Sequence, residues 1–225
     1  MQFTSINFLA FLALLIFAYY VVPKKIQWIV LLVASYIFYI SAGLEYLVFI
    51  LFTTITTYIT ARIIDFRLSK QKAYLAENKE KLSKEEKKQY KNHIKNINRI
   101  FLIVYLVLNF AVLFFCKLIL IEPFTSMLSG SSVGFLSLCL PFGISFYMFQ
   151  SVGYVIDIFR ETAKAEKNFF KTALFVSFFP QLVQGPISKF SHLAPQLFSE
   201  HKFDGKNLSY GLQRVLWGFF KKLVI

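Results

Sequence analysis

Long apolar runs alternate with charged segments along this chain. Residues 3–22, 26–42, 46–64, 100–121 and 135–159 are mainly hydrophobic. A helix needs about 20 mostly apolar residues to cross about 30 Å of hydrocarbon. Four of these runs approach or reach that length, and 26–42 is shorter but uncharged. The pattern predicts an all-α polytopic membrane protein with about five transmembrane helices, and residues 1–225 are expected to form a single membrane domain.

Between the third and fourth runs lies the one long hydrophilic segment, residues 65–99. It mixes Lys and Glu at helical spacing, which favours a solvated helix or a helical hairpin. Near the end of the chain, residues 207–225 place apolar and basic side chains on opposite helix faces. This pattern is typical of an amphipathic helix in the plane of the membrane interface.

Residues 169–190 are apolar but too short to cross a bilayer as one helix. Pro180, Gly185 and Pro186 interrupt them, and basic residues flank them on both sides. Broken backbone at membrane depth is tolerated only where it is buried in protein or lines a wet cavity. The segment is therefore predicted to be re-entrant, entering and leaving by the cytoplasmic face.

Composition and charge support a membrane location. Hydrophobic residues make up 56% of the chain, Phe alone occurs 28 times, and the net charge is +13. The basic residues follow the first, third and fifth runs, whereas residues 41–45 and 122–134 contain no Lys or Arg. Because basic loops stay in the cytoplasm, residues 65–99 are expected there and the N-terminus outside. The basicity is thus explained by topology and lipid contact, and no nucleic-acid partner is expected.

Few residues offer recognisable chemistry. Cys116 and Cys139 both lie in apolar runs, so neither a disulfide nor a metal site is predicted. The histidines, at positions 93, 192 and 201, lie outside every predicted span. Gln150 falls in mid-span, where an unpaired amide is costly. Asp157 and Arg160, one turn apart at the end of the fifth run, form either an interfacial ion pair or part of a site.

Two motifs carry a family resemblance. Residues 140–160 read Leu-Pro-Phe-Gly-Ile-Ser-Phe-Tyr-Met-Phe-Gln-Ser-Val-Gly-Tyr-Val-Ile-Asp-Ile-Phe-Arg, and 178–190 read Phe-Phe-Pro-Gln-Leu-Val-Gln-Gly-Pro-Ile-Ser-Lys-Phe. Pro-Lys-Lys at 23–25 and Ser-Tyr-Ile-Phe-Tyr at 35–39 add to these. Together they resemble the membrane-bound O-acyltransferase family, most closely its branch of alginate and cell-wall polysaccharide O-acetyltransferases.

This resemblance implies transfer of an acyl group, expected to be acetyl, from a cytosolic donor such as acetyl-CoA to an extracytoplasmic polysaccharide hydroxyl. A partner protein outside the membrane is expected to finish the transfer, membrane lipids surround the chain, and no bound cofactor is expected. The candidate residues for the substrate or donor path all lie within the two motifs. They are Pro180, Gln181, Gln184, Gly185, Pro186, Lys189, Asp157 and Arg160. The competing interpretation of the residues from 180 to 189 is a structural turn.

No catalytic residue is assigned. Members of this branch carry a histidine in a Trp-His context, and neither Trp28 nor Trp217 has an adjacent His. The resemblance places that histidine downstream of Ile225, so the chain is expected to be an N-terminal half that is inactive alone. The alternatives are a transporter or flippase subunit, whose broken helices also line a midplane site, and a non-catalytic membrane scaffold. The adjacent and dissimilar breaks at Pro141 and Pro180 count against a transporter.

Overall fold

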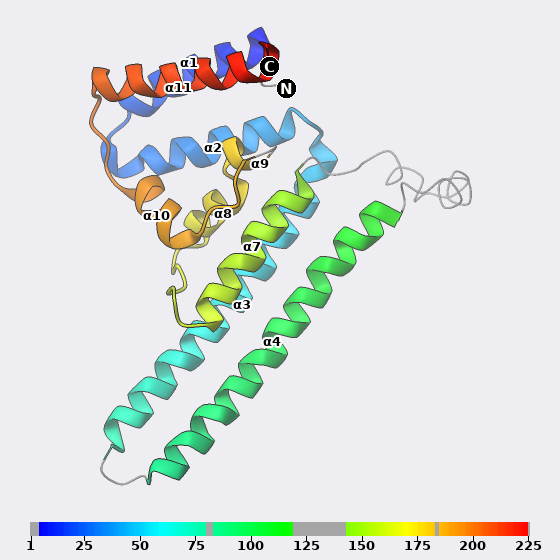
Figure 1. Cartoon of the computed structure of the whole chain (residues 1–225), viewed down its shortest axis with the longest axis vertical. Coiled ribbons are helices and arrows are strands. Elements are labelled where there is room, and N and C mark those ends of the chain that lie inside the picture. Colours follow the sequence, from blue (N-terminus) through cyan, green and yellow to red (C-terminus); the bar gives the residue numbers. More distant parts are fainter. Residues whose placement is uncertain (1–4, 80–82, 119–142, 183–184, 225) are drawn as a thin grey trace.

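The computed structural model describes residues 5–79, 83–118, 143–182 and 185–224, and Figure 1 shows their arrangement. Every regular element in this described part is helical. In chain order they are α1 (Ile6–Val21), η1 (Lys24–Ile26), α2 (Gln27–Ile40), η2 (Leu44–Tyr46), α3 (Leu47–Glu77), α4 (Lys84–Leu118), α7 (Ile144–Phe159), α8 (Phe169–Ser177), α9 (Phe179–Leu182), α10 (Phe190–Phe198) and α11 (Gly205–Val224). The predicted all-α class is therefore confirmed.

Two helices, Leu44–Glu77 and Lys84–Lys117, are long and apolar enough to cross a membrane. α1 and α7 are apolar but only 16 residues long, and α2 has 14. Part of the predicted fifth run, including the break at Pro141, lies outside the described residues. The exact count of five transmembrane helices stays a prediction.

α3 and α4 are much longer than the apolar runs within them. They contain 31 and 35 residues, which at 1.5 Å per residue is about 46 and 52 Å. The described parts of the charged segment thus continue α3 as far as Glu77 and begin α4 at Lys84, and the two helices pack against each other as the arms of a helical hairpin. Ser83 and Glu86 start α4 as a capping box, in which each backbone N–H donates to the other residue's side chain, at 2.8 and 3.2 Å.

The first of these hydrogen bonds, together with hydrogen bonding of the carboxyl group to the Ser83 side chain, changes the acidity of Glu86. Donation from the Ser83 backbone, and then from its side chain, holds the pKa of Glu86 below its ordinary value.

Below α7 in Figure 1, the charged ends of α3 and α4 extend past the end of that helix. The cytoplasmic placement of this hairpin stays a prediction.

α3, α4 and α7 lie side by side and form the main layer (Figure 1). Buried polar groups join α3 and α4: the Thr57 and Tyr105 hydroxyls lie 2.9 Å apart, and the Asn109 amide donates to Thr56 at 3.3 Å. The apolar half of α4 still exposes Ile103, Val107 and other large side chains. Such a broad apolar surface suits contact with lipid.

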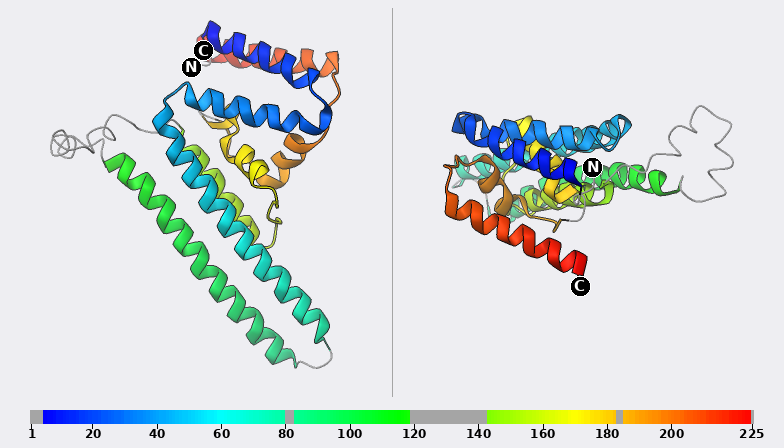
Figure 2. Two further views of the ribbon diagram at one scale, coloured as in Figure 1. Left: turned by 180° about the vertical axis from the view of Figure 1, so that it is seen from behind. Right: turned by 90° about the horizontal axis from the view of Figure 1, so that it is seen from above.

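α1 and α2 pack on each other and run across the top of this layer at a steep angle, as both side views show (Figures 1 and 2). The short helices α8, α9 and α10 fill the angle between α2 and α7. α11 is amphipathic as predicted, yet side chains on its length such as Tyr210 and Trp217 are exposed. Its apolar face is thus available to a membrane interface, which is where the sequence placed it.

Candidate functional site

Two glycines, one from each motif, lie close to the backbone of α9. Gly143 precedes α7 with a left-handed φ of 73°, and a Cβ there would overlap the Leu182 carbonyl oxygen. A Cβ on Gly185 would lie 2.6 Å from the Cα of Gln181. Real Cβ atoms essentially never come so close, so both positions require glycine for the backbone approach itself. The two motifs therefore meet at one point in space.

The break between α8 and α9 leaves backbone groups that other helices satisfy. In a continuous helix the Phe179 N–H would donate to the Phe175 carbonyl. Phe178 instead leaves the helical region, with ψ 105°, and the Phe179 N–H donates to the Ser35 hydroxyl of α2 at 3.3 Å. The freed Phe175 carbonyl accepts from the Gln150 amide of α7 at 2.9 Å. Gln150, in the middle of the predicted span, thus has a hydrogen-bond partner.

An aromatic cluster also holds α9 in place. The Phe179 ring lies against Phe8, Phe11 and Phe38, with centroids 5.6 to 6.5 Å apart. Rings at this separation and tilt add to the stabilisation that burial provides. The cluster joins α1, α2 and α9, so the short helix is held both by aromatic packing and by the hydrogen bond from the Phe179 N–H to Ser35.

Gln181 is the polar residue of this junction. Its Nε2 donates to the Ser188 hydroxyl at 2.8 Å and so closes the turn. Its Oε1 is buried and has no hydrogen-bond partner within the described residues. A buried acceptor without a partner is costly, so Gln181 can accept a hydrogen bond from a bound molecule at little additional cost.

The other predicted residues of this segment lie further out. Pro180, Pro186 and Lys189 are exposed, and Gly185 is partly buried. Gln184 lies outside the described residues. The structure therefore brings Gln181 and Gly185 together at α9 and leaves the Lys189 ammonium in an exposed position at the start of α10.

Asp157 and Arg160 are not part of this junction. They lie at the C-terminal end of α7, whereas Leu182 contacts Gly143 at its N-terminal end. The 16 residues of α7 separate the two places by about 24 Å. The structure thus splits the predicted site residues into two groups, one at each end of α7.

The ion pair considered for Asp157 and Arg160 does not form in the structure. α7 ends at Phe159, and the chain turns at Glu161, whose φ is +60°. This turn directs the Glu161 carboxylate to Lys72 of α3, with 2.6 Å between the two charged groups. The acidic partner at this helix end is therefore Glu161, which the sequence analysis did not single out.

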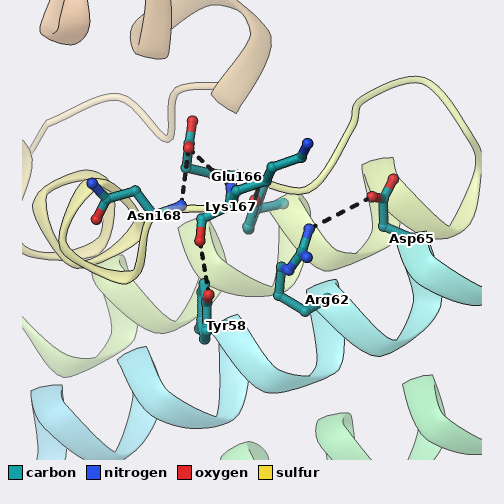
Figure 3. Close-up of polar contacts among 7 residues, drawn as sticks. Tyr58, Arg62, Asp65, Glu166, Lys167 and Asn168 are labelled. Carbon is teal, nitrogen blue, oxygen red and sulfur yellow. Dashed lines mark hydrogen bonds and ion pairs between the residues drawn. The ribbon is translucent and has the colours of Figure 1, made fainter.

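The loop after this turn is tied to α3, as Figure 3 shows. The Tyr58 hydroxyl donates to the Lys167 carbonyl at 2.8 Å. The Glu166 carboxylate accepts from the N–H groups of Lys167 and Asn168, at 2.9 and 3.1 Å. Asn168 then caps α8 by accepting from the Phe170 N–H at 2.9 Å. These contacts fix where α8 begins.

The path from Asn168 to Phe190 runs inward and then back. α8 starts beside the C-terminal part of α7, where Tyr154 accepts from the Glu166 N–H at 2.8 Å. The chain reaches Gly143 at Leu182. It then returns, since the Phe190 ring packs on Tyr154 at 4.5 Å. This is the course expected of a re-entrant segment, while its membrane faces stay a prediction.

The three histidines belong to parts of the chain other than α9: His93 is in α4, His192 in α10, and His201 between α10 and α11. His93 and His192 are exposed. His201 joins the end of the chain to α1 and α2: its Nδ1 lies 2.9 Å from the Tyr19 hydroxyl, and its backbone exchanges two hydrogen bonds with the Gln27 amide, at 3.0 and 3.1 Å. Its role is therefore structural. Within the described residues, no three His, Cys, Asp or Glu side chains gather closely enough to hold a metal ion.

Comparison with known proteins identifies relatives for part of the chain. It is 42% identical over 86 residues to a probable alginate O-acetylase of Pseudomonas fluorescens, covering 38% of this chain and 17% of that protein. The protein of that name from Pseudomonas aeruginosa is 40% identical over 86 residues, 38% of this chain and 16% of that protein. A peptidoglycan O-acetyltransferase of Helicobacter pylori is 31% identical over 116 residues, with coverages of 40% and 22%.

The matches span about a fifth or less of each relative's length. No family model matches the chain, and no solved structure matches it. The resemblance found in the motifs is confirmed by these relatives, which are alginate and peptidoglycan O-acetyltransferases by name. Together with the two long apolar helices, they support a membrane protein related to O-acetyltransferases.

Proposed function

We propose that this chain forms part of a membrane-bound O-acetyltransferase that moves an acetyl group from cytosolic acetyl-CoA to a polysaccharide hydroxyl outside the membrane. The acceptor is a glycan hydroxyl or a group on a partner protein that completes the transfer. The names of the relatives support the reaction. The observation that carries the proposal for this chain is the broken α8–α9 segment, which α2 and α7 hold in the interior.

The two groups of candidate residues mark the ends of the proposed path. Asp157 and Arg160 lie at the end of α7 that is predicted to face the cytoplasm, and Gln181 with Gly185 lies at the opposite end. The unpartnered Oε1 of Gln181 would accept a hydrogen bond from the acceptor hydroxyl or from the donor. The exposed Lys189 ammonium would meet a phosphate of the donor as a point charge.

The reaction also needs a base. The acetyl carbon leaves the sulfur of acetyl-CoA for the acceptor oxygen, the thiolate departs, and the hydroxyl proton must pass to a general base. His201 is engaged by Tyr19 and Gln27, and His93 and His192 are exposed, so we propose that a residue outside these 225 supplies that base. The chain then provides the path and the binding groups.

The proposal is tested by measuring O-acetyl groups on extracellular polysaccharide. Cells that lack the gene should lose these groups and regain them when the intact coding region is restored. Membranes from the restored cells should transfer radiolabel from acetyl-CoA to the polysaccharide. Unchanged O-acetyl content in cells without the gene, with the polymer still produced, would refute the proposed function.

A further inference from the structure

A basic cleft opens between α3, α4 and the C-terminal end of α7. Its volume is about 1010 Å³. The acidic residue in its lining is Glu161, which already pairs with Lys72. Six further cations line it without an acidic partner among the described residues: Lys79, Lys87, Lys91, Lys95, Arg99 and Arg160. The cleft therefore concentrates positive charge that the described part of the chain does not neutralise.

The spacing of residues along α4 places four of these cations on one face of the helix. Lys87, Lys91, Lys95 and Arg99 follow one another at intervals of four residues, and like charges at this spacing destabilise a helix. The acids of the hairpin that the structure describes do not line the cleft. Glu86 lines a separate hollow with Tyr74 and Tyr90, and neither Glu77 nor Glu85 lines the cleft. A solvated hairpin does not require its basic residues to be grouped in one cleft, apart from its acidic residues. A surface that binds anions does require this.

A buried amide at the apolar end of the same row gives independent support. Asn98 precedes Arg99, lines the cleft and is 1% exposed. Neither its Nδ2 nor its Oδ1 has a hydrogen-bond partner within the described residues. Because buried amides are almost always paired, a donor group here points to a ligand with acceptor oxygens.

We propose that this cleft binds several phosphate groups held close together. Lysine ammonium groups meet phosphates as point charges, and the Arg99 and Arg160 guanidinium groups present paired donors. The phosphates belong either to one soluble polyphosphate or to clustered anionic lipid headgroups at the inner membrane surface. Arg160 belongs both to this cleft and to one end of the proposed acetyl path, but pyrophosphate binding is measured without acetyl transfer, so a failure of this proposal and a failure of the proposed function are distinguishable.

Binding is tested by titrating inorganic pyrophosphate into the purified chain in a neutral detergent and measuring heat. Lys91→Gln combined with Lys95→Gln should weaken binding about tenfold or more, since two charge-assisted contacts are lost. Lys84→Gln combined with Lys88→Gln removes the same charge from the same helix outside the cleft, and it should change the affinity less than twofold. No saturable binding, or an equal loss in both double variants, would overturn the proposal.

Asn98→Leu separates ligand binding from folding. Leucine has a similar volume and needs no hydrogen bond, so the melting temperature should hold or rise while pyrophosphate affinity falls several-fold. Unchanged affinity would remove Asn98 from the site. The source of the phosphates follows from titrations in nanodiscs. If pyrophosphate binds in phosphatidylcholine discs but not in phosphatidylglycerol discs, headgroups fill the cleft; equal affinity in both assigns a soluble ligand.

Discussion

The Gln150 amide donates to the carbonyl oxygen of Phe175 at 2.9 Å, across the interface between α7 and α8. This bond exists because the Phe179 N–H, the usual partner of that carbonyl, is used by Ser35. The interruption of the α8–α9 segment is therefore completed by two other helices. A polar residue in the middle of an apolar run here has a definite structural task.

Gln150→Leu should destabilise the protein by about 1–3 kcal/mol, because it leaves a buried carbonyl oxygen without a partner. The measurement is thermal unfolding in detergent micelles. Gln89→Leu makes the same chemical change at an exposed position of the hairpin and should have little effect. Equal melting temperatures for the Gln150 variant and the unaltered chain would contradict the assigned role.

Gly185→Ala should also destabilise the chain, by about 1–3 kcal/mol. The added Cβ would lie 2.6 Å from the Gln181 Cα, and neither backbone can yield without moving α9. Gly153→Ala is the matched control, since no atom lies within 4 Å of a Cβ built there; alanine within helix α7 should be neutral or stabilising. Compared with the unaltered chain, Gly185→Ala should therefore have a lower melting temperature and Gly153→Ala an equal or higher one.

If the proposed function holds, Gln181→Ala in the intact protein should lower acetyl transfer about tenfold or more, because it removes the acceptor proposed to bind the reacting groups. Ser188→Ala is the control, because it removes the hydrogen bond that closes the turn but leaves the Gln181 Oε1 in place. Thr54→Ala, in the buried part of α3, should have a smaller effect. If Ser188→Ala and Gln181→Ala reduce transfer equally, Gln181 has only a structural role.

Membrane topology is tested by thiol labelling from outside the cell, in a chain whose Cys116 and Cys139 have been replaced by alanine. A cysteine at position 130 should react, and one at position 89 on the hairpin should not until the membrane is opened. The expectation follows from the distribution of basic residues. The reverse labelling pattern would place the hairpin outside and invert the proposed direction of transfer.

The purified chain should show no acetyl transfer from acetyl-CoA when it is assayed alone. His201 is held by Tyr19 and Gln27, and His93 and His192 are exposed, so none of the three imidazoles is both buried and free to act as a general base. Loss of a general base costs about 10²–10⁴ in rate. Turnover that His201→Ala abolishes would contradict this arrangement.

Much of the fold follows from the apolar runs and the charges between them. The all-α class, the helical form of residues 65–99 and the amphipathic end of the chain require only periodicity. The position of α9 does not, because it depends on contacts of Phe179 with Ser35 and of Leu182 with Gly143, over more than 35 residues of sequence in each case. Local patterns carry no information about such partners.

The candidate site, like the fold, could be predicted from the sequence only in part. The prolines and glycines of the motifs correctly indicated broken backbone, and Gly185 proved to be a point of close approach. The pairing of Lys72 with Glu161 was not foreseen, because it depends on the left-handed turn at Glu161. The four-residue repeat of Lys87, Lys91, Lys95 and Arg99 was visible in the sequence, yet its significance required the position of α7.

The supports of α9 also define an order of biogenesis. Ser35, Gln150 and Gly143 all precede residue 179, so a ribosome delivers them to the membrane before α9 emerges. Since synthesis proceeds at about 5–20 residues per second, the receiving slot has seconds in which to assemble. The α8–α9 segment can then pack against these residues as soon as it leaves the insertion machinery. Its free backbone groups are thereby not exposed to lipid.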